Sequence, residues 1–286
     1  MSIAKAHADG VYDEPLVSVI IPSKNSERTI AECLGSVAAQ SYKRTQVIVV
    51  DRFSTDSTRE IAQAMGALVV SLDGERSEAK NLGAKWAGGR YLYFVDSDHR
   101  LDHDAIADCV ESIREVDGVV VRDLDIAKGS RLSRLVASRR RVLSYDSLNV
   151  AVRFVRKDAF DRLGGFNRDL YLGEDLDFQR RFVLHGFKMA YSRAKEWHLG
   201  SPIDLRGLLN RSSYYSSNYP RYFSENSMIA LKRLSPTGMI RSWKMGEDRG
   251  PDLLQVVFLG FLADLFLMLS LLLNLTLGQN SLKRAE

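Results

Sequence analysis

Two aspartates close a strongly apolar segment at a spacing that suits a divalent metal. The segment "GGRYLYFVDSDHR" runs through five apolar or aromatic residues and then places Asp96 and Asp98 on either side of Ser97. An ionised carboxylate in a dry interior costs several kcal/mol unless it is paired or bound to a metal. One interpretation is therefore a surface turn at the end of a strand. The other is a site at the strand's carboxyl end, where both carboxylates share one cation.

Apolar strands and helices alternate along the part of the chain that must position these aspartates. Strands are predicted over residues 16–22, 45–51, 67–72 and 90–96, and helices over 26–40, 54–66, 76–89 and 102–116. Ser26 is expected to cap the first of these helices. The alternation predicts parallel βαβ units, and hence a Rossmann-like α/β fold with a mostly parallel sheet and helices on both faces.

The pattern loosens beyond residue 120. A basic amphipathic helix is predicted over residues 129–145, a strand over 149–156, and short helices over 158–165 and 176–186. The arginines of the basic helix are either a solvated face or a contact for an acceptor's lipid phosphate; they are Arg131, Arg134, Arg139, Arg140 and Arg141.

Composition narrows the class of protein without selecting a partner. The chain has 286 residues, 45% of them hydrophobic, and a net charge of +4, so it is long enough to bury a core and is mildly basic. No nucleic-acid recognition motif accompanies the charge, so a nucleic-acid partner is not expected. The two cysteines, Cys33 and Cys109, lack metal-ligand spacing. Residues 1–15 lack the apolar core of a signal peptide and are expected to be a flexible tail.

The C-terminal part has the composition of a membrane anchor. Residues 253–277 are almost wholly apolar and would span about 37 Å as a helix, so a transmembrane segment is predicted over 251–278 with a tail over 279–286. A buried helix or an oligomer interface is the alternative. Asp264 near the centre costs about 2.5–3.5 kcal/mol in a bilayer, so it is expected to face protein, a partner helix or water. A partner helix would make the protein a homo-oligomer through this segment. Residues 201–250 are expected to be amphipathic interface helices, because 205–223 mix leucines, arginines and five aromatic residues.

Four segments together resemble the family-2 glycosyltransferases, which have the GT-A fold. They are "VSVIIPSKN", "VIVVDRFSTDST", "RSEAKNLGAKWAGGRYLYFVDSD" and "GGFNRDLYLGEDLDFQRR", in the order and spacing of that family. The resemblance covers residues 16–200 and implies a catalytic domain there. It further implies an inverting transfer of a sugar from a nucleotide-sugar to an acceptor, usually with Mn²⁺ or Mg²⁺.

The resemblance also implies roles for individual residues of the donor site. Asp96 and Asp98 match the family's DxD metal position, and His198 in "KEWHLG" matches a histidine that completes the metal site in some relatives; a structural histidine is the alternative. The nucleotide and its diphosphate are assigned to Pro22, Ser23, Asn25, Asp51, Arg76, Lys80 and Asp96. Arg52 stands where the family commonly has a second acid, which weakens any expectation of uridine. For Arg76 and Lys80, a solvated helix face is the alternative.

The segment "GEDLDF" matches the family's ED motif, with Glu174 and Asp175 as the catalytic pair and Asp175 as the base. An inverting transfer needs a carboxylate opposite the leaving group to accept the proton of the acceptor hydroxyl. Helix capping by acids is the alternative, and Asp177 could cap while Asp175 acts as the base.

These observations favour a membrane-attached inverting glycosyltransferase that acts on a lipid-linked, polyprenyl-type or glycan hydroxyl. Because nucleotide-sugars are cytosolic, the catalytic domain is expected to face the cytoplasm. One alternative is a polyprenyl-phosphate sugar synthase of the dolichyl-phosphate-mannose type, whose ionised acceptor needs no strong base. Another is a non-catalytic membrane protein that binds nucleotide-sugars.

Overall fold

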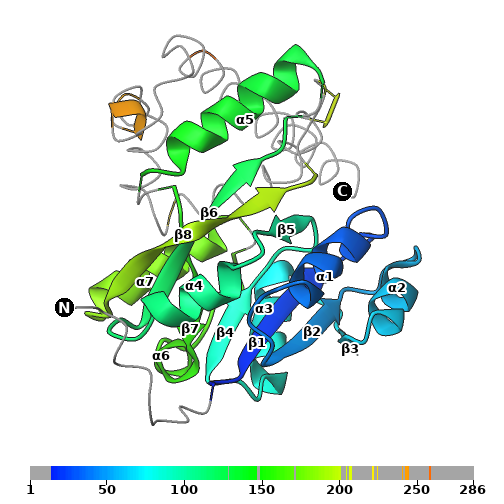
Figure 1. Cartoon of the computed structure of the whole chain (residues 1–286), viewed down its shortest axis with the longest axis vertical. Coiled ribbons are helices and arrows are strands. Elements are labelled where there is room, and N and C mark those ends of the chain that lie inside the picture. Colours follow the sequence, from blue (N-terminus) through cyan, green and yellow to red (C-terminus); the bar gives the residue numbers. More distant parts are fainter. Residues whose placement is uncertain are drawn as a thin grey trace, which may run out of the picture.

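One eight-stranded sheet organises the protein (Figure 1). The computed structural model describes residues 14–200 apart from 128, 147, 148 and 171, together with 204, 206, 207, 221, 224, 240, 242–244 and 258. The strands are β1 (Val17–Ser23), β2 (Thr45–Asp51), β3 (Leu68–Ser71), β4 (Tyr91–Phe94), β5 (His99–Leu101), β6 (Gly118–Asp125), β7 (Val152–Arg156) and β8 (Met189–His198). The helices are α1 (Ile30–Ala38), α2 (Thr58–Ala64), α3 (Arg76–Trp86), α4 (Ala105–Ser112), α5 (Arg131–Leu143), α6 (Lys157–Arg162) and α7 (Glu174–Leu184).

The sheet is parallel in one half and mixed in the other, with the strand order β3-β2-β1-β4-β7-β6-β8-β5. The pairs β1–β2, β2–β3 and β1–β4 are parallel, as predicted. β7 runs antiparallel to both β4 and β6, and β5 runs antiparallel to β8. The prediction of a mostly parallel sheet is therefore wrong for the second half. Helical crossovers keep β1 to β4 parallel, although β3 and β4 are not neighbours. After β4 this rule fails, because β5 follows β4 with no helix between them and β7 runs antiparallel to β6 despite the intervening α5.

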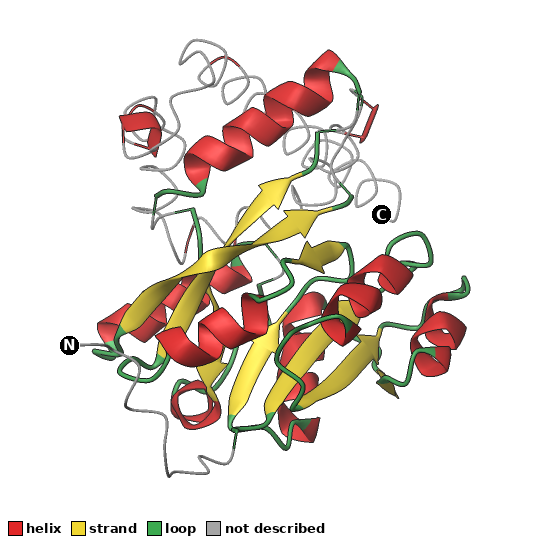
Figure 2. Cartoon of the chain, in the orientation of Figure 1, coloured by secondary structure: helices red, strands yellow, loops and turns green. Residues whose placement is uncertain are grey.

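Helices cover both faces of the sheet, as expected (Figure 2). One face packs Val17, Val19 and Ile21 of β1 against α1, α2 and α4. The other face packs Ile20 against α3, α6 and α7, where a cluster of phenylalanines fills the core. Gly83 lets α3 approach β1 closely, because a Cβ there would lie 2.3 Å from Ile20 Cγ2. The alternation of side chains along a strand thus buries both faces of β1.

The predicted helix starts need two corrections. α1 begins at Ile30, and the amide nitrogens of Thr29 and Ile30 bond to the main-chain oxygen of Ser26 rather than to its side chain. The Ser26 hydroxyl instead contacts Ser97 at 2.8 Å, which ties the end of β1 to the segment after β4. α3 begins with a capping box between Glu75 and Glu78, which the sequence analysis did not identify.

β6 and β8 extend beyond the main sheet toward α5, which lies across their far ends (Figure 1). Ser130 caps α5 by accepting a hydrogen bond of 3.0 Å from the amide of Ser133. Arg140 points inward from α5 and pairs with Asp125 at 3.2 Å and Asp123 at 3.3 Å. The expectation that Arg140 joins a solvated or lipid-facing row is therefore wrong, while Arg131, Arg134 and Arg141 are exposed.

The predicted membrane-interface and transmembrane segments fall almost entirely outside the described residues. Within the part of the chain that the structure describes, no helix combines the length and the apolar character needed to cross a bilayer.

Candidate active site

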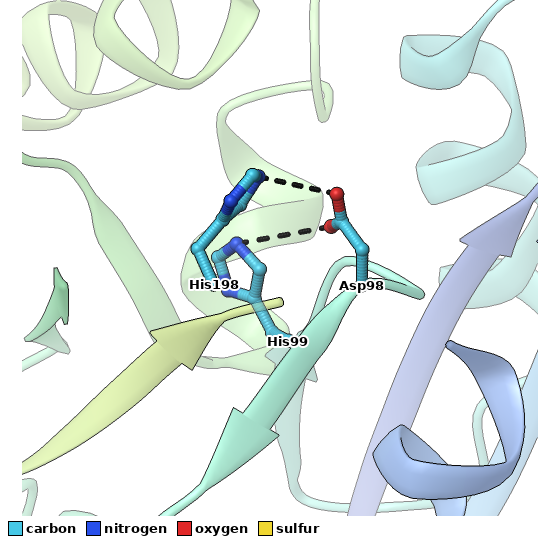
Figure 3. A group of neighbouring side chains, drawn as sticks. All are labelled: Asp98, His99 and His198. Carbon is cyan, nitrogen blue, oxygen red and sulfur yellow. Dashed lines mark ion pairs between the residues drawn. The ribbon is translucent and has the colours of Figure 1, made fainter. Parts of the chain in front are cut away.

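Asp98, His99 and His198 form a compact cluster at the end of the sheet (Figure 3). Asp98 immediately precedes β5, and His198 ends β8; the antiparallel register pairs His99 with His198. Asp98 Oδ2 lies 3.1 Å from His198 Nε2, and Asp98 Oδ1 lies 4.0 Å from His99 Nε2. One ligand atom from each side chain lies within 4.8 Å of the others. The predicted pairing of Asp98 with His198 is thus present in the geometry, and His99 joins it.

A second carboxylate orients each histidine of this cluster. His99 Nδ1 lies 2.7 Å from Glu196 Oε2, and His198 Nδ1 lies 3.4 Å from Asp125 Oδ1. Both Nε2 atoms are consequently directed toward Asp98, the arrangement that metal-binding histidines usually show. A carboxylate with two imidazoles fits a transition-metal ion such as Mn²⁺ better than Mg²⁺, which prefers oxygen ligands.

The protonation states of Asp98 and His198 suit a cation, whereas the pKa of His99 is shifted toward the protonated form. Burial raises the pKa of Asp98, but the hydrogen bond and charge of His198 outweigh it and hold that pKa below its ordinary value. Burial dominates at His198 and lowers the pKa of that imidazole. At His99, burial lowers the pKa, but the hydrogen bond to Glu196 outweighs it and leaves the pKa raised. Near neutral pH, Asp98 is therefore ionised and His198 is neutral, the forms that bind metals.

Asp96 does not join this cluster but binds an arginine. Arg153 of β7 donates to Asp96 Oδ2 at 3.1 Å and to Glu196 Oε2 at 3.1 Å. Glu196 is fully buried and also accepts a hydrogen bond of 2.9 Å from the hydroxyl of Tyr93. Burial raises the pKa of Asp96, but Arg153, followed by Lys80, outweighs it and holds the pKa well below its ordinary value. Asp96 thus stays ionised beside the cluster, 3.9 Å from His99 Nε2.

Glu174 and Asp175 begin α7 and have different surroundings. Glu174 is buried, and its Oε1 lies 3.0 Å from Lys80 Nζ and 3.7 Å from Arg76. Lys80 also lies 5.0 Å from the centre of the Phe166 ring, so it is a buried ion-pair partner rather than part of a solvated helix face. Asp175 is partly exposed, and its side chain accepts a hydrogen bond of 2.9 Å from the amide of the neighbouring Leu176.

Arg153 is surrounded by carboxylates that keep it protonated. Burial lowers the pKa of Arg153, but the surrounding carboxylates outweigh it and raise the pKa well above the ordinary value. In decreasing order of effect, these carboxylates are Glu196, Asp96, Asp123 and Asp175. Arg153 pairs directly with Asp96, Asp123 and Glu196, and Asp175 adds a weaker charge effect.

Asp177 does not cap α7. The residue before the helix is Gly173, with a φ of 71°, and no side chain caps it. Asp177 instead accepts hydrogen bonds from Arg181 at 2.8 Å and Arg180 at 3.2 Å. Arg181 also donates to the carbonyl oxygens of residues 163 and 165, so Asp177 holds the preceding loop against α7.

The carboxyl ends of β1 and β2 form a second polar cluster around Asp51. Asp51 is fully buried and accepts hydrogen bonds from Ser23 at 3.2 Å and from the Ser54 hydroxyl and amide at 2.5 and 2.9 Å. Asn25 has a φ of 48°, and its side chain accepts a hydrogen bond of 2.9 Å from the amide of Thr55. These contacts hold two of the predicted nucleotide residues, Ser23 and Asp51, side by side at the ends of β1 and β2.

The ends of β1 and β2 differ from expectation in two respects, the position of Pro22 and Ser23 and the pairing of Arg52. Pro22 and Ser23 lie within β1 rather than after it, and both are buried. Arg52 donates to Glu75 and to the carbonyl oxygen of Gly74, each at 2.6 Å, so its charge is paired. The next residue, Phe53, has a φ of 50° and is 55% exposed, so its aromatic ring is accessible to solvent just after β2.

Sequence analysis missed the residues that support the cluster. Glu196 and His198 are two positions apart, which places them on the same face of a strand, but the strand itself was not predicted. Recognising β8 would have identified Glu196. No local pattern pointed to Arg153 or Asp125, because their partners lie on other strands. Trp197, between Glu196 and His198, donates to Asp102 at 2.7 Å.

Solved structures with similar architecture define the class of fold. The mannosyltransferase PcManGT from Pyrobaculum calidifontis, solved with GDP-Man and Mn²⁺, matches with a TM-score of 0.61 over 92% of this chain and 87% of its own, at 17% identity. The structure of S. aureus TarS 1–349 with UDP matches with a TM-score of 0.52 over 89% and 88%, at 20% identity. Identities this low show the fold alone, and it is the GT-A fold of glycosyltransferases.

Sequence similarity then gives the family. The family model described as "Glycosyl transferase family 2" matches residues 18–198, well over half of the 286-residue chain. The chain belongs to glycosyl transferase family 2. This confirms the resemblance inferred from the four segments.

Curated relatives of the chain carry glycosyltransferase names. Glycosyltransferase AglE of Haloferax volcanii is 28% identical over 202 residues, which are 62% of this chain and 64% of AglE. Glycosyltransferase GlyG of Streptococcus pneumoniae is 32% identical over 113 residues, 37% of this chain and 38% of GlyG. The chain therefore spans less than two thirds of the length of these relatives.

Proposed function

We propose that this protein transfers a sugar, with inversion, from a nucleotide-sugar to a hydroxyl group of a lipid-linked or glycan acceptor, and that it uses Mn²⁺. The observation that carries the proposal is a metal-type cluster at the carboxyl end of the sheet, together with a partly exposed carboxylate at the start of α7. Asp98, His99 and His198 supply the cluster, and Asp175 supplies the carboxylate. An inverting transfer needs both a stabiliser for the leaving diphosphate and a base for the acceptor.

Asp98, His99 and His198 would hold the metal ion. When bound, the ion supplies positive charge that stabilises the diphosphate leaving group. Glu196 and Asp125 fix the histidine rings, and Arg153 keeps Asp96 ionised beside them. The Ser23–Asp51 turn and Asn25 are proposed to bind the nucleoside.

Asp175 is proposed to act as the base. The acceptor oxygen forms a bond to the anomeric carbon while the bond from that carbon to the diphosphate oxygen breaks. The electron pair of the broken bond leaves with the diphosphate, and the hydroxyl proton passes to the Asp175 carboxylate. Glu174 is already neutralised by Lys80 at 3.0 Å, so its role is to position the start of α7.

Related proteins support the substrate classes. TarS 1–349 has been solved with UDP-GlcNAc, and PcManGT with GDP-Man and Mn²⁺. The Escherichia coli relative WfgD, 36% identical over 91 residues, is named as a glucosyltransferase acting on a GlcNAc-diphosphoundecaprenol. The Staphylococcus aureus relative TarS, 36% identical over 107 residues, is named as a poly(ribitol-phosphate) N-acetylglucosaminyltransferase. We propose an acceptor of the same broad kind, bound at a membrane surface.

Replacing the base tests the mechanism. Asp175→Asn should lower the rate of sugar transfer by about 10²–10⁴-fold, the range for a general base, while the dissociation constant of the nucleotide-sugar stays unchanged. Asp158→Asn is the matched control, because Asp158 lies on α6 with its side chain 73% exposed. Full transfer by Asp175→Asn would contradict a hydroxyl acceptor activated by this residue. It would favour an acceptor that is already ionised, such as a polyprenyl phosphate.

Membrane attachment is proposed from the sequence of the C-terminal part. Residues 205–223 would lie at the bilayer interface and residues 251–278 would cross it, with the catalytic domain on the cytoplasmic side. Asp264 would face a second copy of the same segment. Truncation after residue 204 should release the protein from membranes. Retention of the truncated chain in the membrane fraction would contradict this assignment.

A further inference from the structure

A basic hollow lies between α5 and the edge of the sheet, next to the transfer site described above. Its volume is about 590 Å³, and its lining includes Arg134, Ala137 and Arg141 of α5 together with Arg100 and Trp197. Positions 134, 137 and 141 follow the spacing of one helical face, so α5 directs a single face at the hollow. Arg100 and Trp197 are cross-strand neighbours on β5 and β8.

The charge of the hollow is positive. Asp125 is its one acidic lining residue, but the carboxylate is 2% exposed and pairs with Arg140 at 3.2 Å. Arg134 donates to the carbonyl oxygen of Gly129 at 2.6 Å, a neutral acceptor, and no ion pair of Arg134 is present among the described residues. Arg100 pairs with Glu32 at 3.2 Å, but both side chains are about half exposed, and such a pair contributes little. The lining therefore favours an anion.

The hollow and the metal cluster share Asp125, which lines the hollow and contacts His198 at 3.4 Å, but the β5–β8 pair directs their other residues to opposite faces. The register aligns His99 with His198 and, one position along, Arg100 with Trp197. Successive residues of a strand point to opposite faces. The two histidines therefore face the metal cluster, while Arg100 and Trp197 face the other side. A ligand held by Arg100 and Trp197 would therefore lie on the face opposite the two histidines.

We infer that this hollow binds a phosphate group attached to an apolar chain. Guanidinium groups bind phosphate oxygens in pairs of parallel hydrogen bonds, and three of them line the hollow. The Trp197 ring and the methyl group of Ala137 form an apolar part of the lining. An apolar chain attached to the phosphate would contact it, whereas inorganic phosphate would not. The inference concerns binding alone and holds whether or not the proposed transfer takes place.

Octyl phosphate is the probe for this site, with inorganic phosphate and octanol for comparison. Binding to the full-length protein in maltoside detergent would be measured by titration calorimetry. Octyl phosphate should bind more tightly than either comparison compound. Arg134→Gln and Arg141→Gln should each weaken its binding by about tenfold or more, because each removes a charge-assisted hydrogen-bond donor. Arg131→Gln is the matched control: Arg131 is exposed on the same helix but does not line the hollow.

Two further variants separate this site from the transfer site. Ala137→Trp fills the hollow without changing its charge and should abolish binding of octyl phosphate. Asp98→Asn should bind octyl phosphate normally while losing metal-dependent donor binding. Equal octyl phosphate affinity in the wild type, the Arg134→Gln/Arg141→Gln double variant and Ala137→Trp would overturn the inference. Loss of donor binding alone would not affect it.

Vesicle flotation distinguishes the two sources of such a phosphate. If the double variant also loses binding to vesicles containing phosphatidic acid, the natural ligand is a bilayer headgroup. If vesicle binding is unchanged and only octyl phosphate binding is lost, the ligand is a single amphiphile, such as a phosphate-linked acceptor. Both results support the site.

Discussion

Replacing Glu196 by glutamine tests how the metal cluster is held. Glu196 is fully buried and accepts three hydrogen bonds, from Tyr93 at 2.9 Å, His99 at 2.7 Å and Arg153 at 3.1 Å. Glutamine keeps the shape but removes the charge, and its amide group cannot accept from all three donors. His99 should then lose its fixed orientation. Loss of such a supporting residue typically weakens metal binding by about 10–100-fold, or about 1.4–2.7 kcal/mol.

The assay is a Mn²⁺ titration followed by the electron paramagnetic resonance signal of the free ion. Glu111→Gln is the control, because Glu111 is exposed on α4 and pairs with Arg114 on the surface. Asp125→Asn should have a smaller effect than Glu196→Gln, since Asp125 contacts His198 at the longer distance of 3.4 Å. Unchanged Mn²⁺ affinity in a folded Glu196→Gln protein would refute the role of Glu196. The thermal unfolding midpoint shows whether the variant is folded.

Two predictions concern stability. Burial raises the pKa of Asp108, but hydrogen bonds from Ser192 and its neighbours outweigh this effect and lower the pKa. The ionised carboxylate therefore stabilises the fold above its unfolded pKa of about 3.9. This stabilisation is lost as the pH falls below that value and the carboxylate is protonated. Asp108→Asn should lower the free energy of unfolding by about 1–3 kcal/mol at neutral pH and reduce the loss of stability between about pH 5 and pH 3; an unchanged pH profile in urea denaturation would contradict this. Gly83→Ala should destabilise by about 1–3 kcal/mol, because its Cβ would lie 2.3 Å from Ile20 Cγ2. Gly35→Ala, which meets nothing within 4 Å, should be neutral or stabilising, and equal unfolding midpoints for the two variants would refute the packing argument.

The first half of the fold was predictable from sequence because its signals are local. Each of the first four strands is a short apolar run, and each is followed by a segment with helical spacing and turn residues. The parallel pairs among them follow from crossover connections. β6 and β8 were missed because charged residues interrupt them, and these charges are paired across strands. Asp123 of β6 and Glu196 of β8, for example, both contact Arg153.

The candidate site was predictable where chemistry and spacing are short-range. The two aspartates after β4 and the acids that begin α7 stand together in the sequence, and His198 was identified through the family resemblance. The distribution of roles within the site depends on distant partners. Arg153 pairs with Asp96 across a sequence separation of 57 positions, and Lys80 neutralises Glu174 across a separation of 94 positions. No single segment of sequence contains that information.

The most direct test of the central claim is metal-dependent binding of a nucleotide-sugar. Thermal unfolding of the full-length protein would be followed with UDP-, GDP-, TDP- and ADP-sugars, each with and without Mn²⁺. A ligand at 100 times its dissociation constant should add about 2.7 kcal/mol to the free energy of unfolding. We predict that one nucleotide stabilises the wild type and Asp175→Asn only when Mn²⁺ is present, and that Asp98→Asn shows no such effect. Stabilisation that is equal in Asp98→Asn, or that needs no metal, would contradict a metal-dependent transferase built on this cluster.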